Sequence, residues 1–237
     1  MTSVVPGGTA GVALVTGAGR GVGRAIALAL ARRGQRLVLL GRPSAGHRET
    51  LELVSELSGH VALEINADFT DALALQRAAQ QIVAEVGAPV LVVHNAGMVV
   101  RARIEDTSVA AWDEQLAVNL RAPFVLTRAL LPSMRAAGHG RFVFIGSISG
   151  TLGSANAAAY AASKWGLTGF TKSLAEELSD SGLMACSVLP GSIDTDMLKG
   201  APYPPRMTAE EVAKTVEFLG LDAPLAHNGA VVEMFGV

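Results

Sequence analysis

GVALVTGAGRGVG, residues 11–23, is the stretch of this chain that decides the fold. Its first part, Gly11 to Thr16, is apolar and predicts a buried parallel strand. A glycine-rich turn follows from Gly17 to Gly23, and an amphipathic helix is expected from about Arg24 to Arg33. Glycines allow a tight turn and let the backbone approach a pyrophosphate, which the free N–H groups and dipole of a helix amino terminus attract. Strand, turn and helix together predict a dinucleotide-binding site; the alternative is a glycine-rich turn that binds nothing.

The spacing of these glycines separates two kinds of dinucleotide turn. The common G-x-G-x-x-G pattern does not fit, because positions that it requires to be glycine fall on Val22 and Arg24. The pattern T-G-x-x-x-G-x-G fits from Thr16 to Gly23.

The rest of the chain alternates apolar runs with helical patterns, which is typical of an α/β fold. Further strands are expected at 36–40, 61–65, 90–93, 142–145, 183–189 and, at the edge of the sheet, 230–234. Helices are expected at 51–57, 71–85, 112–134, 158–179 and 209–219, with Pro123 bending or breaking the third of them. We therefore predict a single domain, residues 1–237, with a Rossmann-type, doubly wound, largely parallel seven-stranded sheet and helices on both faces.

Composition excludes several classes of function. The 19 basic and 21 acidic residues are scattered and give a net charge of −2, so a nucleic-acid partner is not expected. Every long uncharged run is interrupted by Gly, Ser, Thr or Asn, and no basic residue precedes Arg20, so neither a membrane span nor a signal peptide is predicted. The one cysteine, Cys186, lies in an apolar run, which favours a cytoplasmic protein and a core position. No His/Cys cluster indicates a metal.

A second stretch, FVFIGSISGTLGSANAAAYAASK at 142–164, carries three polar groups suited to catalysis. Ser147 follows an expected strand, at the edge where α/β sheets bind ligands. Tyr160 and Lys164 lie four residues apart on one helix face, so we expect the ammonium to lower the pKa of the phenol toward working pH. The trio suits carbonyl reduction or alcohol oxidation, with Tyr160 exchanging the proton and Ser147 binding the oxygen. The alternative is an ordinary Tyr-x-x-x-Lys surface pair.

At this point an ordered set of motifs resembles a known family. The set is TGAGRGVG at 16–23, HNAG at 94–97, Asn119, Ser147, the Tyr160/Lys164 pair, and Pro190-Gly191 followed by Thr195. In order and spacing these motifs resemble the short-chain dehydrogenases/reductases, with the 3-oxoacyl-carrier-protein reductases the nearest subgroup.

The resemblance implies hydride transfer between NADP(H) and a small-molecule or carrier-bound carbonyl compound or secondary alcohol. It implies that Lys164 also holds the nicotinamide ribose, that the backbone carbonyl of Asn119 holds a water linking Lys164 to solvent, and that the chain forms a homo-oligomer. The family usually has Asn where this chain has His94, for which a structural role is expected. The positions expected to contact the cofactor are Gly17, Gly19, Arg20, Gly21, Val22, Gly23, Arg42, Asp68, Phe69, Asn95, Ala96, Gly97, Tyr160, Lys164, Pro190, Gly191, Ile193 and Thr195.

Several of these assignments have alternatives. The strand at 36–40 ends at Gly41-Arg42, where dinucleotide folds that bind NAD(H) place an acid on the ribose, and this acid is absent here. Arg20 and Arg42 could instead bind a 2′-phosphate, so we predict NADP(H) over NAD(H). Two solvated arginines, and with them an NAD-dependent alcohol or steroid dehydrogenase, are the alternative. A sensor that binds NADPH without turnover is another. Asp68 would border the adenine or, alternatively, cap the helix that begins near Asp71.

Two further expectations concern the surroundings of the site. The short, proline-containing connection at 196–207 predicts an open substrate pocket. Ala158, Ala162, Trp165 and Gly169 lie on the side of their helix opposite Tyr160, which suits either core packing or a helix contact between subunits.

Overall fold

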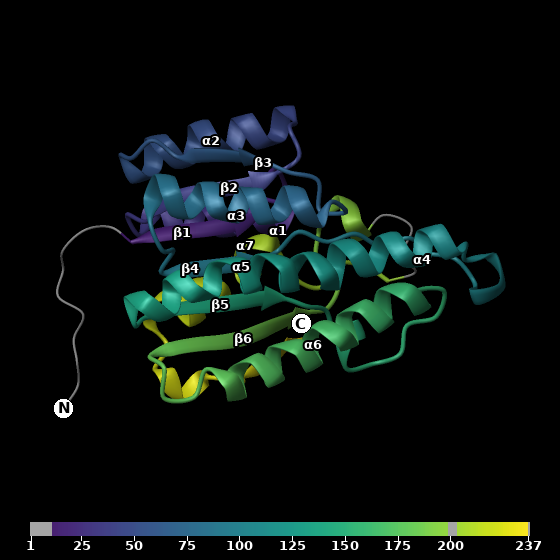
Figure 1. Ribbon diagram of the computed structural model, residues 1–237. Helices are drawn as coiled ribbons and strands as arrows, with labels where there is room; N and C mark the ends of the chain where they lie inside the picture. The colour runs from purple at the N-terminus through teal and green to yellow at the C-terminus, as the bar shows by residue number, and fades with distance from the viewer. Residues whose placement is uncertain (1–10, 199–202, 237) are drawn as a thin grey trace.

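The computed structural model describes residues 11–198 and 203–236. Among these residues seven strands form one sheet, paired in parallel throughout, in the order β3-β2-β1-β4-β5-β6-β7 (Figure 1). The predicted Rossmann-type sheet is confirmed. Its strands are β1 Val12–Thr16, β2 Arg36–Gly41, β3 Leu63–Asn66, β4 Leu91–His94, β5 Gly140–Ile145, β6 Leu183–Pro190 and β7 Val231–Met234.

Helices cover both faces of the sheet, as expected. One face packs against α1 (Gly21–Arg32), α2 (Ala45–Ser58) and α7 (Ala209–Glu217), and the other against α3 (Ala72–Val86), α5 (Ala122–Ala137) and α6 (Ala158–Glu177) (Figure 1). The helix α4 (Val109–Leu116) precedes α5 and packs beside α6.

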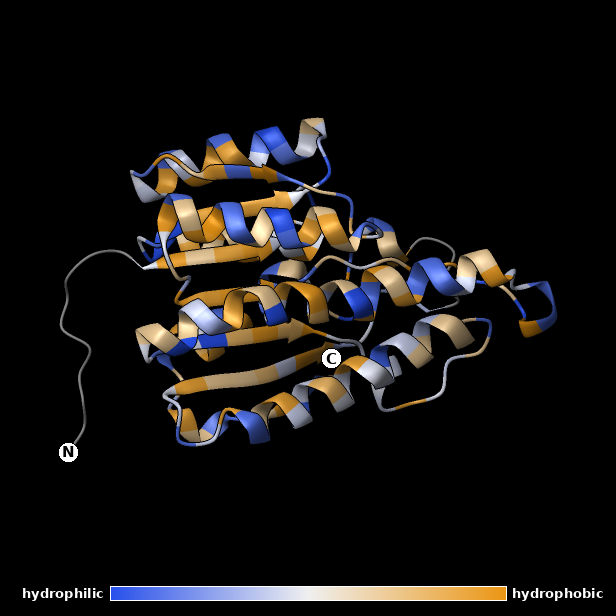
Figure 2. Cartoon of the chain, viewed as in Figure 1, coloured by the Kyte–Doolittle hydropathy of each residue, from blue (hydrophilic) through white to orange (hydrophobic). Residues whose placement is uncertain are grey.

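The central strands β1, β2, β4, β5 and β6 are buried on both faces, which explains their nearly continuous apolar sequences, whereas the edge strands β3 and β7 are partly exposed. Side chains alternate between the two faces along each strand: Phe142 and Phe144 pack toward α3, α5 and α6, whereas Val143 and Ile145 pack toward α1 and α7. In Figure 2 the strands are hydrophobic along most of their length, and the helices alternate hydrophobic and hydrophilic positions. This double-sided burial holds the strand ends, and the loops that follow them, in fixed positions.

Three helices begin earlier than the sequence predicted, and one of them is α4, which begins at Val109 and not at Trp112. The helix α1 begins at Gly21, so part of the glycine turn is helical. The helix α2 begins at Ala45 and not at Leu51, because Ser44 caps it by accepting a hydrogen bond from the His47 N–H at 3.1 Å. Its first turn is polar, so apolar periodicity did not reveal it.

The predicted disturbance near Pro123 takes the form of a π-helical turn. The chain stays helical from α4 through the turn Ala117–Arg121 into α5, which begins at Ala122. Pro123 lies in the first turn of α5 and lacks an N–H to donate, and the π-helical turn comes directly before it. Of the two predicted effects, a bend or a break, the break does not occur: the helix is distorted in a turn that includes Asn119, one turn before Pro123.

The capping alternative for Asp68 is wrong. Asp71 caps α3 by accepting hydrogen bonds from the N–H groups of Leu73 and Ala74. Asp68 accepts instead from the N–H and the hydroxyl of Thr70, each at 2.8 Å.

Candidate active site

The carboxyl ends of the strands open into one large cleft. The connections from β1 and β4 leave toward opposite faces of the sheet at the point where the strand order reverses, which is where doubly wound folds bind ligands. The cleft has a volume of about 2340 Å³, which exceeds the roughly 300–1,000 Å³ of an ordinary small-molecule pocket. It therefore has room for a dinucleotide and a second molecule together.

The structure brings nearly all of the predicted site residues to this cleft. Every predicted cofactor position lines it, and so do Ser147, Tyr160 and Lys164. Asn119 does not line it, because the side chain of Asn119 is completely buried behind the cleft wall. Motifs that lie as far apart in sequence as Gly17 and Thr195 thus share one cleft.

The glycine turn is shaped by close backbone approach. Gly17 has φ +68°, a conformation that favours glycine. A Cβ on Gly23 would lie 2.3 Å from the Gly17 carbonyl oxygen and 2.4 Å from Nδ2 of Asn95. Only glycine fits at position 23, and the helix terminus consequently meets the end of β1 without a side chain between them.

Asn95 and Thr16 join the glycine turn to the end of β4. The Asn95 amide donates to the carbonyl oxygens of Thr16 and Gly17 at 3.0 and 3.1 Å. The Thr16 hydroxyl accepts from the N–H groups of Asn95 and Ala96 at 2.9 and 3.0 Å. The amide of Asn95 thus positions the turn, a role that the resemblance did not specify.

The amino terminus of α1 fits the phosphates of a dinucleotide. Arg20 is its N-cap residue and provides no side-chain cap, and the first turn contains no acidic residue. The first N–H groups of α1 therefore have no capping side chain and face the lined cleft, where an anion would satisfy them.

Arg24 clamps the turn to α2 and was missed as a site residue. Its Nη2 donates to the carbonyl oxygens of Gly19 and Gly46 at 2.9 and 3.1 Å, and it pairs with Glu49 at 2.7 Å. In the sequence, Arg24 stands out only as a mismatch to the glycine pattern, although its position directly after the turn is visible there.

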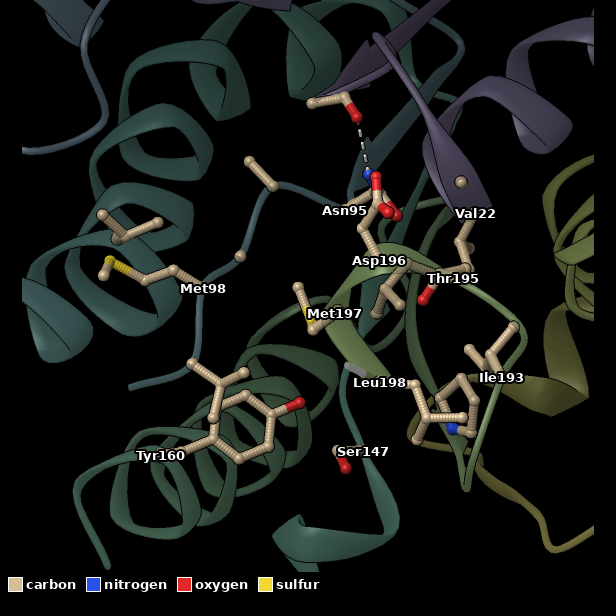
Figure 3. A pocket seen from close by; sticks show the side chains of 18 of the residues that line it. Val22, Asn95, Met98, Ser147, Tyr160, Ile193, Thr195, Asp196, Met197 and Leu198 are labelled. Atoms are coloured by element: carbon tan, nitrogen blue, oxygen red, sulfur yellow. Dashed lines mark hydrogen bonds between the residues drawn. The ribbon is translucent and has the colours of Figure 1, made fainter. Parts of the chain in front are cut away.

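Tyr160 and Ser147 face one another across the inner part of the cleft. In Figure 3 the Tyr160 ring reaches from α6 toward the loop that carries Ser147, with Met98 and Met197 nearby. Burial raises the pKa of Tyr160 above its ordinary value of 10.0, while hydrogen bonding with Ser147 and the charge of Arg101 act in the opposite direction. Ser147 itself is held at the end of β5, where its hydroxyl accepts from the Ser149 N–H at 3.1 Å.

The expected effect of Lys164 on this phenol is wrong in this arrangement. The Lys164 ammonium donates to the Ile145 carbonyl oxygen of β5 at 2.8 Å, and its Nζ lies 5.7 Å from the centre of the Tyr160 ring. It is directed at the sheet and not at the phenolic oxygen, so desolvation of Tyr160 prevails. Burial likewise lowers the pKa of Lys164, to about 8.

The Asn119 side chain is hydrogen-bonded within the protein through both its oxygen and its nitrogen. Its Oδ1 accepts from the Met98 N–H at 2.8 Å, and its Nδ2 donates to the Met98 carbonyl at 2.8 Å and to the Ser163 hydroxyl at 3.0 Å. These bonds join the π-helical turn to α6 one residue before Lys164. The proton-relay role of its backbone carbonyl stays a prediction.

His94 has the structural environment that was expected. Its ring stacks on Phe144 with centroids 4.7 Å apart, and its Nε2 lies 3.0 Å from the Thr127 hydroxyl. Burial lowers its pKa to about 3, so the imidazole is neutral and supports the sheet.

The arginines expected to choose the cofactor both line the cleft. Arg20 pairs with Asp196 at 3.1 Å and is 80% exposed. Arg42 is exposed after β2, and its charge helps to lower the pKa of Asp68, after the larger effect of the Thr70 hydrogen bonds. A Cβ on Gly41 would lie 3.0 Å from the buried His47 ring, so the end of β2 has little space for a side chain. No ion pair of Arg42 is found among the described residues, whereas Arg20 has one.

The cleft also has a mixed apolar and basic wall, which sequence analysis identified only in part, through the connection at 196–207. The expected open connection is described only in part, because residues 199–202 lie outside the described residues. Beside it, Asp196–Leu198 forms a short 3-10 turn, and a bridge pairs Ile193 with Met207. Wall residues not predicted as site residues include Met98, Arg101, Leu152, Met197, Tyr203 and Phe235.

The described residues hold no group of three or more His, Cys, Asp or Glu side chains arranged to bind a metal. In the same part of the chain, no helix has the length and apolar character needed to cross a membrane.

The outer side of α6 is exposed, which rules out one of the two predictions made for it. Ala158, Trp165 and Gly169 are exposed, Trp165 at 52%, so the core-packing alternative is wrong for them. A contact between subunits stays a prediction.

Comparisons with known proteins agree with this geometry. The family model described as short chain dehydrogenase matches residues 11–203. A relative from Pseudomonas aeruginosa, 3-oxoacyl-[acyl-carrier-protein] reductase FabG, is 35% identical over 95% of this chain and 96% of its own length. Cis-4-hydroxycyclohexanecarboxylate dehydrogenase from Sinomonas cyclohexanicum is 33% identical over 95% of each chain. Among solved structures, a putative NAD(P) dependent gluconate 5-dehydrogenase from Beutenbergia cavernae, with bound NADP at low occupancy, superposes with a TM-score of 0.88 at 33% identity and 94% coverage of both chains.

Proposed function

Because the chain belongs to the short-chain dehydrogenase family, we propose that it is an NADP(H)-dependent oxidoreductase that interconverts a carbonyl compound and a secondary alcohol. The observation that carries the proposal is the convergence of Ser147, Tyr160 and Lys164 on the cleft that the glycine turn also lines. A ketone or 3-oxoacyl-type compound, free or carrier-bound, is the proposed substrate class.

Each residue of the proposed active site has its own role in the reaction. A bound dihydronicotinamide supplies the hydride that reaches the carbonyl carbon. Ser147 donates a hydrogen bond to the carbonyl oxygen and fixes its place, and Tyr160 gives that oxygen its proton. Burial raises the pKa of Tyr160, so the phenol carries the proton that reduction requires. Lys164 holds the nicotinamide ribose, and Asn119 and water resupply the proton.

The preference for NADP(H) is proposed from the surface after β2. No acidic residue stands at Gly41 or Arg42, and the exposed Arg42 lines the cleft beside Ser44, the cap of α2. An arginine there suits a 2′-phosphate, through charge-assisted hydrogen bonds. The NADP bound to the Beutenbergia cavernae neighbour supports the same choice.

The function itself is tested by following NADPH consumption with β-ketoacyl thioesters, quinones and cyclic ketones. We expect wild-type protein to consume NADPH with at least one of these classes. A protein that binds NADPH tightly yet reduces none of them, and oxidises none of the corresponding alcohols, would instead be a sensor.

Arg42→Ala tests the cofactor preference. We expect kcat/KM for NADPH to fall by about 10- to 100-fold, since a hydrogen bond to a charged group contributes about 1.5–3 kcal/mol. The value for NADH should change little. Arg48→Ala, an exposed arginine on α2 that does not line the cleft, is the matched control. Higher wild-type efficiency with NADH, or an unchanged preference in Arg42→Ala, contradicts the NADP(H) proposal and favours the NAD-dependent alcohol or steroid dehydrogenase.

We propose that the protein is one catalytic domain, residues 1–237, that works as a cytoplasmic homo-oligomer. The exposed side of α6, with Trp165, supports a subunit contact there. The single cysteine, Cys186, is buried without a disulfide partner, which suits a reducing compartment.

A further inference from the structure

The substrate side of the cleft carries a cationic group that the proposed reaction does not use. Arg101 lines the cleft on the segment that follows the His94–Gly97 motif. Its charge acts on the Tyr160 phenol, so the guanidinium lies within electrostatic reach of the reacting oxygen. A positive charge at this place would act on any substrate held for reduction.

The position of Arg101 is set by buried groups around its backbone. The N–H of Met98 donates to Asn119 and that of Val100 to Gln115, at 2.8 and 2.9 Å, and both acceptor side chains are fully buried. The N–H of Ala102 donates to the Asn156 carbonyl at 2.9 Å. Alternate residues of the segment are thus fixed to three other parts of the structure, and Arg101 projects from a backbone held on both sides.

The guanidinium reaches the opposite wall of the cleft. Arg101 Nη1 lies 3.3 Å from the Met197 carbonyl oxygen, which uses one of its five N–H donors. No ion pair of Arg101 is found among the described residues, whereas Arg103 lies 3.6 Å from Glu105 and Arg20 lies 3.1 Å from Asp196. Arg101 therefore keeps donors for a ligand.

The same cleft offers an apolar surface for the body of such a ligand. Apolar residues that line it include Met98, Val99, Leu152, Met197, Leu198 and Phe235. An apolar body with one anionic end matches this combination of an apolar wall and a cation.

We propose that Arg101 binds an anionic group of the substrate, a carboxylate or a phosphate, and so places the carbonyl of an oxo acid at Tyr160 and Ser147. The inference rests on the proposed function and narrows its substrate class to anionic ketones and their alcohols. Arg101 is then a residue that determines specificity, while Ser147 and Tyr160 carry the chemistry.

Matched ketones test the inference. The pairs are 4-oxocyclohexanecarboxylate with its methyl ester, and dihydroxyacetone phosphate with dihydroxyacetone; the pair with the larger contrast identifies the anion. We expect wild-type protein to prefer the anion, and Arg101→Gln to lose about 10- to 100-fold in kcat/KM for it. The neutral ketone should lose less than about 3-fold, because it makes no charged bond to this side chain.

Two variants sharpen the result. Arg101→Lys keeps the charge but not the planar fork, so it should recover part of the anion preference. Arg103 also lines the cleft but pairs with Glu105 at 3.6 Å, so Arg103→Gln should leave the ratio of anion to neutral ketone unchanged. The inference would be overturned if Arg101→Gln lost kcat/KM equally for the anionic and the neutral ketone of a pair. It would also be overturned if wild-type protein reduced both ketones with equal kcat/KM.

A binding measurement separates this inference from the proposed function. With NADPH present, cyclohexanecarboxylate should raise the melting temperature of wild-type protein and not that of Arg101→Gln, and cyclohexanecarboxamide should affect neither. If no ketone is reduced but this difference is found, the anion site stands and the proposed reaction falls. If wild-type protein shows neither turnover nor the carboxylate effect, both fall.

Discussion

Tyr160→Phe is expected to weaken NADPH binding by no more than about 10-fold, the loss of one hydrogen bond. It should reduce ketones about 10²- to 10⁴-fold more slowly, the usual contribution of a positioned general acid. The phenyl ring keeps the packing of the Tyr160 side chain on α6 and removes only the hydroxyl that faces the cleft. Steady-state reduction of the best ketone of the panel, together with NADPH binding followed by fluorescence, measures the two properties separately.

The chain offers a matched control for this variant. It has two tyrosines, and the second, Tyr203, also lines the cleft but is 54% exposed. Tyr203→Phe should keep most of the activity. Comparable losses in both variants, or an active Tyr160→Phe, would show that the proton comes from another group.

The parts of the fold that could be predicted are those set by local pattern. Seven apolar runs predicted the parallel strands, because strands buried on both faces tolerate few polar residues. The glycine turn was equally predictable, since the approach of Gly23 to Gly17 excludes any Cβ. Ser147 and Tyr160 were placed correctly because a strand end and a helix face fix where their side chains begin.

The parts that could not be predicted depend on tertiary partners. Helical spacing correctly placed Lys164 beside Tyr160, but the direction of its ammonium depends on the Ile145 carbonyl of β5. The form of the distortion near Pro123 depends on the bonds of Asn119 to Met98 and Ser163. Arg101 belongs to a segment without periodicity, so only the bonds that hold its backbone reveal its place.

Replacing the buried Lys164 is expected to lower activity and to raise stability. Lys164→Met should lose at least about 10²-fold in turnover, because it removes the group that we propose holds the nicotinamide ribose and connects to the proton relay. The same variant should be more stable than wild-type protein at pH 7 without cofactor. Burial lowers the Lys164 pKa from 10.5 to about 8, which corresponds to about 3 kcal/mol of cost for the charged form. Losing the bond to Ile145 offsets about 1 kcal/mol of this.

The net gain of about 2 kcal/mol should raise the melting temperature by about 4–8 °C in a chain of this size. Lys172→Met, which changes an exposed lysine of the same helix, should alter stability by less than about 0.5 kcal/mol. A Lys164→Met protein that is less stable than wild type at pH 7 would contradict the cost assigned to the buried ammonium.

The pH dependence of the difference distinguishes charge burial from better packing by methionine. The folded pKa of Lys164, about 8, lies below the unfolded value of 10.5, so folding favours the neutral amine. Below about pH 8 the lysine is protonated in both states, and wild-type protein bears the full cost. Between about pH 8 and 10.5 the folded state releases its proton first, so wild-type protein gains stability relative to Lys164→Met. Chemical denaturation at pH 7, 9 and about 10.5 should show that the difference in unfolding free energy between the two proteins shrinks as pH rises. A difference that stays constant would mean that the packing of methionine, and not a buried charge, makes Lys164→Met more stable.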